Sequence, residues 1–224
     1  MTEAAASMVR LSFDLGENTP GYGGSDGFGT RQLQDLDKGD TSNCQQWRLF
    51  NHIGTHIDAP KHFSKNGATI DQFPDDFWRF ERVALIDYAA QPGELLGPEV
   101  FANGLNENTE LVLIRTGFEA RRMEQVYWEN NPGVRPECGS MLRESYPKLR
   151  AIGFDFISLS AYQNRPLGRV AHRAFLEPDN PGTPILIIEE MRLAVLETLP
   201  KWVLVAPLMV KGADGAPVTV FAGC

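Results

Sequence analysis

The sequence contains few cysteines, and their arrangement indicates neither a disulfide framework nor a cysteine-based metal site. There are three, Cys44, Cys138 and Cys224, and this odd number has spacings that match neither kind of motif. The N-terminal residues also lack the basic stretch and the apolar core of a secretory signal peptide. These absences predict reduced thiols and a cytoplasmic protein.

A surplus of positive charge is also absent. The chain has 21 Lys and Arg against 29 Asp and Glu, which gives a formal net charge of -8. Nucleic acids and anionic membrane surfaces attract basic proteins, so we expect neither as a partner. No apolar run approaches the roughly 20 residues of a membrane-spanning helix. The expected partner is a small-molecule substrate.

Internal repeats, low-complexity blocks and interdomain linkers are missing as well. The 224 residues suffice for one domain with a sizeable core, so we expect a flexible tail over residues 1–8 and a single domain over residues 9–224. Residues 15–45 are rich in Gly, Asp, Asn, Ser and Thr, which predicts a long loop.

What the sequence does contain is a series of short apolar runs rich in β-forming residues, which predict strands. They cover residues 82–88, 110–116, 151–156, 184–188, 202–210 and 218–222. Helical composition lies between some of them, at residues 118–130, 137–146 and 189–199. This pattern indicates a strand-rich α/β fold without a clear βαβ alternation.

The histidines are the most informative residues. Only four exist, and three of them, His52, His56 and His62, fall within eleven residues together with Asp58. Histidine is the commonest metal ligand among side chains. Isolated histidines usually have no such role, but a dense His/Asp cluster beside Gly and Pro predicts a metal site.

The backbone must bend within this cluster if its residues are to share one ion. In a straight strand with a rise of about 3.3 Å per residue, His52 and Asp58 would be roughly 20 Å apart. Ligand bonds of about 2.0–2.2 Å do not allow that separation. Gly54 is the residue best able to bend the chain, and Pro60 ends the strand before His62.

The same segment resembles the signature of the putative cyclase family, which includes bacterial kynurenine formamidase and isatin hydrolase. The matching residues are His52, Gly54, Thr55, His56, Asp58, Pro60, His62 and Phe63. Further matches are Leu113-Ile114-Arg115-Thr116-Gly117, Ile152-Gly153-Phe154-Asp155 with Ser158-Leu159, and His172 followed by Leu186-Ile187-Ile188-Glu189. The resemblance extends over about residues 10–220.

This resemblance implies a set of roles. His52, His56 and Asp58 would bind a first metal ion, and Asp58 would bridge to a second ion held by His172 and Glu189. His62 would be the catalytic proton shuttle. The implied cofactor is zinc or manganese, with one or two ions per chain. The implied fold is a swivelling β/β/α arrangement of layered sheets with helices, assembled as a homodimer or a higher homo-oligomer.

Two departures from the family pattern leave alternatives open. The segment from Arg173 to Thr183 is longer than in the formamidases, and Glu190 follows Glu189 directly, so the choice between the two carboxylates stays open. Glu189 is the expected ligand because it directly follows the apolar run. The region from Phe13 to Tyr22 also lacks the Trp that lines the substrate pocket of the kynurenine formamidases. We expect Phe13 and Tyr22 to line a substrate pocket here, for a substrate that need not be formylkynurenine.

The leading hypothesis is a metal-dependent amidohydrolase that cleaves a C–N bond in a small N-acyl, N-formyl or cyclic amide. The metal would activate water, and His62 would move the proton to the leaving nitrogen. A second hypothesis is a cyclase or lactone hydrolase acting on a polyketide-like substrate with the same metals. A third is a metal-binding protein without turnover, which would not need His62.

Overall fold

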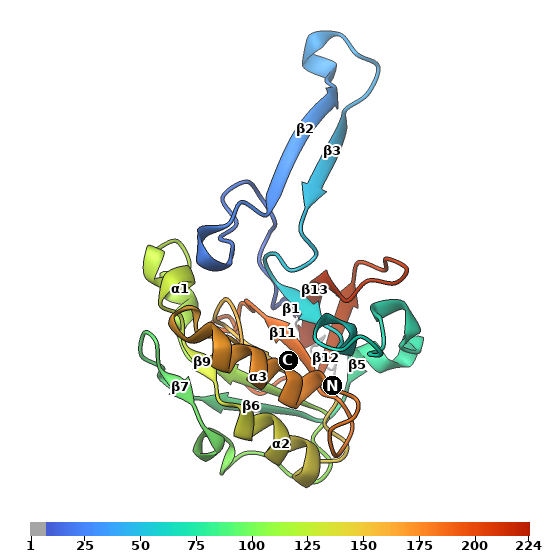
Figure 1. Cartoon of the computed structure of the whole chain (residues 1–224). Coiled ribbons are helices and arrows are strands. Elements are labelled where there is room, and N and C mark those ends of the chain that lie inside the picture. The colour runs from blue at the N-terminus through green and yellow to red at the C-terminus, as the bar shows by residue number, and fades with distance from the viewer. Residues whose placement is uncertain (1–7) are drawn as a thin grey trace, which may run out of the picture.

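Four parallel strands form one half of the central sheet. The computed structural model describes residues 8–224. The four strands lie side by side in the order in which they are listed here (Figure 1): β6 (Val83–Asp87), β8 (Leu111–Arg115), β10 (Ala151–Phe154) and β11 (Leu186–Glu189). Each falls within or close to a run in which the sequence predicts a strand, because these runs are apolar and rich in β-branched residues.

Antiparallel strands continue the sheet beyond β11. They are β4 (His56–Asp58), β13 (Gly215–Gly223), β12 (Trp202–Pro207), β5 (Arg79–Phe80) and β1 (Met8–Arg10). β4 lies between β11 and β13, and β1 pairs with β13. The chain is therefore a strand-rich single domain with a nearly closed mixed sheet and few helices, as the sequence predicts.

Residues 8–224 contain three α-helices: α1 (Gln125–Glu129), α2 (Pro136–Ser145) and α3 (Arg165–Leu176). α2 and α3 pack on each other, and both contribute buried side chains to the core beside the parallel strands (Figure 1). Along the chain, α2 lies between β8 and β10, and α3 lies between β10 and β11, so the parallel strands are joined through helices within the strand-rich α/β fold. The sequence pattern does not predict α3, which contains Pro166 and Gly168. A small parallel pair, β7 (Leu95–Leu96) and β9 (Gly133–Val134), lies beside these helices.

The core has two parts, one on each face of the sheet. In β8, Val112 and Ile114 point to the part that contains the helices, whereas Leu111 and Leu113 point to the part formed with β12 and β13. Side chains alternate between the faces of a strand, so a continuous apolar run is the pattern expected when both faces are covered.

An arm of two strands, β2 (Phe28–Gln34) and β3 (Cys44–Leu49), extends away from the body (Figure 1). The two strands pair only with each other among the described residues. The predicted loop over residues 15–45 is therefore wrong for the arm. The sequence could not indicate strands here, because almost all of the arm is exposed and lacks an apolar face.

Two predicted helices also need correction. Residues 118–130 form a short 3₁₀ turn, Phe118–Arg121, followed by α1 rather than one helix. Residues 189–199 contain no helix at all: Glu189 ends β11, and Met191 forms an isolated bridge with Ser12. Buried contacts of Met191 and Leu193 with the sheet core outweigh the helix propensity of this segment.

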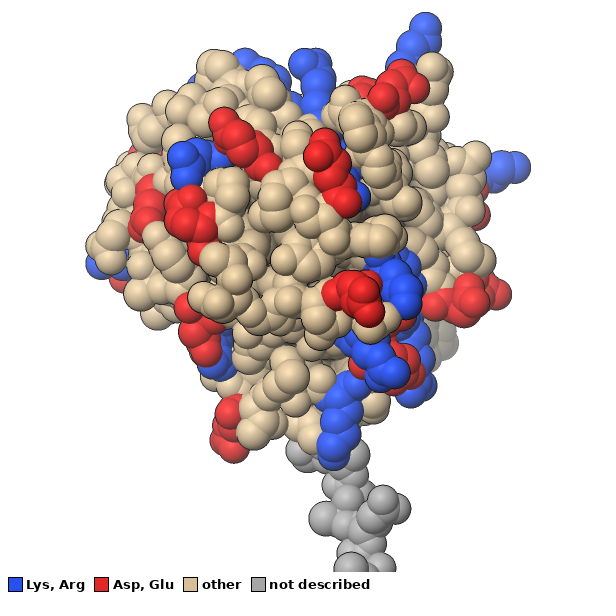
Figure 2. Space-filling model, turned by 90° about the horizontal axis from the view of Figure 1, so that it is seen from below, with Lys and Arg blue, Asp and Glu red and all other residues tan. Residues whose placement is uncertain are grey.

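The flexible tail predicted for residues 1–8 lies outside the described residues except for Met8, which begins β1. Within residues 8–224, no helix has both the length and the apolar character needed to cross a membrane. On the face shown in Figure 2, acidic and basic side chains are interspersed and no broad basic area is present.

Candidate metal centre

The local backbone around β4 bends as the sequence predicts. Gly54 has a φ of 62°, a left-handed conformation that favours glycine. Pro60 begins a 3₁₀ turn, Pro60–His62, directly after the strand. The two bends place His52 before the strand and His62 after it on the same cavity, together with His56 and Asp58 from the strand itself.

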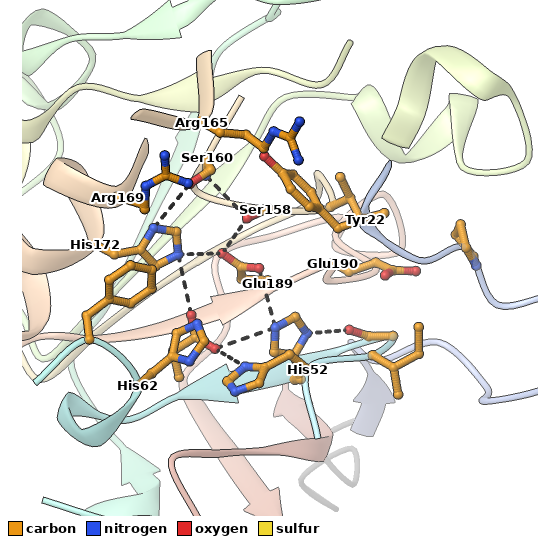
Figure 3. Close-up of a pocket in the computed structure, with 17 residues that line it drawn as sticks. Tyr22, His52, His62, Ser158, Ser160, Arg165, Arg169, His172, Glu189 and Glu190 are labelled. Carbon is orange, nitrogen blue, oxygen red and sulfur yellow. Dashed lines mark hydrogen bonds and ion pairs between the residues drawn. The ribbon is translucent and has the colours of Figure 1, made fainter. Parts of the chain in front are cut away.

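Two histidines and two carboxylates face one another in this cavity, and Figure 3 labels His172 and Glu189 among them. His56 Nε2 lies 3.5 Å from Asp58 Oδ1 and 3.4 Å from Glu189 Oε2. His172 Nε2 lies 3.6 Å from Asp58 Oδ2 and 3.6 Å from Glu189 Oε1. Two atoms bound at about 2.0–2.2 Å to one tetrahedral ion are about 3.4 Å apart, so each of these nitrogen–oxygen pairs has the spacing of two ligand atoms of one ion. His56 and His172 face different oxygens of each carboxylate.

The orientation of the two buried histidines fits a ligand role. His56 Nδ1 donates to the carbonyl oxygen of Gly54 at 2.8 Å, and His172 Nδ1 donates to the carbonyl oxygen of Gly168 at 2.8 Å. These bonds occupy Nδ1, so Nε2 is the nitrogen of each ring that faces the two carboxylates and is available to a metal ion. The donor set of imidazole nitrogens and carboxylate oxygens suits zinc or manganese.

His52 and His62 lie on the open side of the cluster and are joined by Asp214. Asp214 Oδ2 is 3.0 Å from His52 Nε2 and 3.0 Å from His62 Nδ1. The other nitrogen of His52 is 2.7 Å from Asp58 Oδ1. The two rings stack with their centroids 3.9 Å apart. His52 Nδ1 thus lies close enough to His56 and Asp58 to be a ligand of the same ion, but here it is hydrogen-bonded to the carboxylate of Asp58.

The two adjacent glutamates have different surroundings. Glu189 is held by the backbone N–H of Leu159, which donates to its Oε1 at 2.7 Å, and it faces the histidines. Glu190 has a φ of 56°, and its Oε1 accepts from Arg122 Nε at 2.7 Å. Burial raises the pKa of Glu190 to about 7, although the charge of Arg122 opposes this shift. Of the two, Glu189 is the carboxylate that lies with the histidine cluster.

The buried histidines and carboxylates of the cluster shift one another's pKa values. Burial alone would lower the pKa of His56, but the contacts with Glu189 and Asp58 outweigh it and raise that pKa to about 9. The same balance raises the pKa of His172 to about 10. Burial of Asp58 is outweighed by the charges of His52 and His62, which hold its pKa well below the usual range. Buried carboxylates that hold protons on imidazoles in this way would equally bind a divalent cation, with release of those protons.

A cavity of about 300 Å³ lies over the cluster and has room for a small molecule. Tyr22 lines it, as the sequence predicts for a substrate pocket. Phe13 does not: it lies in a neighbouring cavity, where the guanidinium of Arg122 stacks over its ring at 4.3 Å. Its position follows from its backbone N–H, which donates to Thr55 Oγ1 at 3.0 Å and fixes it beside β4.

Several residues of the site escaped the sequence analysis. Asp214 lies in the turn between β12 and β13, within Gly212-Ala213-Asp214-Gly215, where Asp and Gly indicate only turn chemistry. A Cβ on Gly215 would overlap the ring of His52, so this glycine is needed for the close approach of β13. Arg169 also lines the cavity. Only the helical periodicity of α3 could have indicated that it shares a face with His172.

A buried cluster of histidines and carboxylates, beneath a small cavity in a nearly closed mixed sheet, defines the chain as a protein with a metal-dependent hydrolase-like fold. Isatin hydrolase A from Labrenzia aggregata, solved bound to benzyl benzoate, superposes with a TM-score of 0.81 over 97% of this chain and 93% of its own, at 24% identity. The structure of a potential metal-dependent hydrolase with cyclase activity superposes with a TM-score of 0.75 over 97% of this chain and 98% of its own, at 20% identity. These similarities establish the fold.

Residues 9–161 match the family model described as Putative cyclase, and the chain belongs to that family. Curated relatives include the kynurenine formamidase of Bordetella avium, 26% identical over 197 residues, which are 80% of this chain and 87% of the relative. Cyclase-like protein 1 of Arabidopsis thaliana is 25% identical over 205 residues, 88% of this chain and 77% of that protein. The family predicted from the histidine motif is thus confirmed.

Proposed function

We propose that this protein is a metal-dependent hydrolase that cleaves the C–N bond of a small N-acyl, N-formyl or cyclic amide. The observation that carries the proposal is the ring of His56, Asp58, His172 and Glu189, with four nitrogen–oxygen separations of 3.4–3.6 Å. These separations are longer than ordinary hydrogen bonds, and each matches the distance between two ligand atoms of the same ion. A cavity over the ring supplies space for the substrate.

The residues that would hold zinc or manganese are His52, His56, Asp58, His172 and Glu189. When bound, such an ion lowers the pKa of water and polarises the substrate carbonyl. The chain fits one or two ions, because Asp58 has one oxygen toward His52 and His56 and the other toward His172.

His62 is the residue that we propose to move the proton. Its Nδ1 is 3.0 Å from Asp214 Oδ2, which keeps the hydrogen on Nδ1 and leaves Nε2 free to accept a proton. Burial lowers the pKa of His62, and the nearby charge of His52 adds to the decrease. A neutral imidazole can take the proton of the attacking water and return it to the departing nitrogen, which an amide requires.

We also propose that the protein works in the cytoplasm. All three cysteines are free: Cys44 is exposed, Cys138 is buried and Cys224 is intermediate. Free thiols are kept reduced in that compartment. Fractionation of cells with an antibody to the chain tests this directly, and recovery of the protein outside the cytoplasmic fraction would contradict it.

Elemental analysis of the purified protein is the first test of the metal site. We expect about one to two equivalents of zinc or manganese per chain, and loss of most of this metal in His56→Ala. All four histidines line the cavity, so the control is Gln32→Ala on the distant arm, which should retain the metal. A wild-type protein that neither carries nor takes up metal would contradict the proposal.

A substrate panel then tests the reaction. We expect hydrolysis of formanilides or of isatin by the metal-loaded protein, and loss of this activity on chelation. Turnover of lactones alone would favour the lactone-hydrolase alternative. Metal binding without turnover of any member of the panel would favour a binding protein.

A further inference from the structure

Helix α3 carries two arginines into the same cavity as His172. Arg165, Arg169 and His172 are spaced i, i+4 and i+7, so they share one helix face, and all three line the cavity. With a rise of about 1.5 Å per residue, Arg169 and Arg165 are about 5 Å and about 10 Å along the helix axis from His172. Figure 3 shows them on the opposite side of the cavity from His52 and His62.

Arg165 and Arg169 are exposed at the mouth of the cavity, and their guanidinium groups form no ion pair with any residue that the structure describes. Arg122, near the same cavity, is neutralised by Glu190 at 2.7 Å. Within residues 8–224, by contrast, neither Arg165 nor Arg169 forms an ion pair with a carboxylate. Like charges at i, i+4 disfavour a helix, and so do cations in its first turns, which here contain no acidic residue. A bound anion would relieve both effects.

Tyr22 adds a hydroxyl that lacks a partner. Its oxygen is buried, and it makes no hydrogen bond with any described residue. The Tyr22 ring packs edge-on to Tyr162 at 5.3 Å, and the guanidinium of Arg165 lies over Tyr162 at 4.7 Å. Tyr22 and Arg165 are therefore held beside the same ring. An acceptor oxygen placed between them would satisfy the hydroxyl.

We infer that Tyr22, Arg165 and Arg169, here named the arginine rim, bind the carboxylate of an anionic substrate whose amide lies over the histidine cluster. The inference rests on the proposed function and narrows its substrate class. A guanidinium binds a carboxylate through paired hydrogen bonds, and a hydroxyl donates a third. In a chain of net charge -8, uncompensated arginines at the cavity also attract an anion that the surrounding carboxylates would repel.

Calorimetric binding to the zinc-loaded protein tests the arginine rim without turnover. The probes are 4-aminobenzoate and aniline, which differ only in the carboxylate. We expect the wild type to bind 4-aminobenzoate at least about tenfold more tightly than aniline, and Arg169→Gln to remove most of this preference. Arg169→Lys should keep part of it, since a lysine retains the charge but not the fork.

The matched control is Arg173→Gln. Arg173 is an exposed arginine one turn further along α3 that does not line the cavity, so the preference for 4-aminobenzoate should persist in this variant. A preference that survives Arg169→Gln unchanged would overturn the inference. The inference would also be overturned if chelation of the metal abolished the preference for 4-aminobenzoate over aniline while Arg169→Gln did not. In that case the carboxylate would bind the metal ion and not the arginine.

Kinetics separate this inference from the function on which it rests. The readout is the ratio of kcat/KM for 4-formamidobenzoate to that for formanilide, which should fall about tenfold in Arg169→Gln and persist in Arg173→Gln. Hydrolysis of both compounds with an unchanged ratio would refute the arginine rim and leave the hydrolase intact. Arg169-dependent binding of 4-aminobenzoate without any hydrolysis would refute the hydrolase and leave the rim intact. Absence of both binding preference and hydrolysis would refute both.

Discussion

At the scale of single residues, Asp214 joins two side chains with different proposed tasks. Its Oδ2 is within hydrogen-bond distance of both His52 and His62, and its Oδ1 accepts from Asn51 Nδ2 at 2.7 Å. The charges and hydrogen bonds of the two histidines outweigh partial burial and lower its pKa. Asp214 is therefore a charged residue that holds the ring of His62, the proposed proton shuttle, in position.

Asp214→Asn should lower kcat/KM by about 10- to 100-fold, because the supporting bond to His62 loses its charge. We expect the loss to appear mainly in kcat, with the metal content kept within error. The measurement pairs steady-state kinetics with elemental analysis, and Asp76→Asn, an exposed residue away from the cavity, is the control. Unchanged kcat would show that Asp214 does not act on the shuttle.

His62→Ala removes the shuttle itself. We expect kcat to fall by about 10²- to 10⁴-fold, the usual contribution of general acid–base catalysis, while the protein keeps its metal. A second variant, His62→Gln, keeps a hydrogen-bonding group but cannot carry a proton, so it should be equally slow. Loss of metal in both variants would instead identify His62 as a ligand, which its position near Asp58 and His172 also allows.

At the scale of secondary-structure elements, Glu110 joins strands that are distant in the sequence. It directly precedes β8, and its Oε2 accepts from the backbone N–H groups of Glu81 and Arg82 at 2.8 and 3.2 Å. Arg150, just before β10, lies 3.4 Å from the same oxygen. Partial burial opposes these interactions, but they lower the pKa of Glu110 below its usual value.

Because this pKa is lower in the folded than in the unfolded chain, Glu110 stabilises the fold above its unfolded value of about 4.3. That contribution is lost as the pH falls from there through the folded pKa. Glu110→Gln should therefore lower the free energy of unfolding by about 1 kcal/mol at pH 7. The decrease should be smaller at a pH below about 4, where the carboxyl group becomes protonated in the wild type as well. Denaturant titrations at both pH values measure this, with the exposed Glu144→Gln as control. An equal loss at both pH values would disprove the role of the charge.

The arm of β2 and β3 pairs with no other strand that the structure describes, and only its base contacts the body, through the buried Phe28 and through Thr30, whose hydroxyl donates to Glu17. Isolated two-stranded hairpins are marginally stable in water. This one exposes 65% of Trp47, and Leu33 and Leu36 are about half exposed. We propose that it contacts a second copy of the chain, which agrees with the homodimer or higher homo-oligomer expected from the sequence.

Trp47→Glu should weaken this association by more than about tenfold, since a buried Trp is a frequent hot spot at interfaces. Sedimentation at several concentrations measures it. Leu199→Glu, at a residue 56% exposed and outside the arm, should leave the oligomer unchanged. A monomeric wild type would end the proposal.

At the scale of the whole molecule, the cluster ties the two halves of the sheet together. Asp58 and His56 come from the antiparallel half, Glu189 from the parallel half and His172 from α3. An ion held by them should stabilise the fold by about 3 kcal/mol at a hundredfold excess over its dissociation constant. Chelation should therefore lower the melting temperature by about 5–10 °C, and zinc or manganese should restore it. A melting temperature indifferent to chelator would contradict a shared site.

The sequence by itself determined the features whose signals are local. The apolar runs of β8, β10 and β11 are readable because both faces of these strands are buried, and that of β6 because one face is buried and the other partly so. The dense histidine motif predicted the family and the bend at Gly54, since a short segment must turn sharply to bring its ligands together. It also predicted that Tyr22 lines a pocket.

Only the tertiary structure decided the features that depend on contacts between distant segments. Glu189 and Glu190 are equivalent in sequence, and the turn after β11 directs one to the histidines and the other to Arg122. Asp214 reaches His62 across 152 positions of the chain. The arm has no core face, so its polar sequence was taken for a loop. Local sequence patterns indicate which faces of a strand or helix are buried. Which side chains from distant segments come into contact depends on the order in which the strands pair, and that order is a property of the tertiary structure.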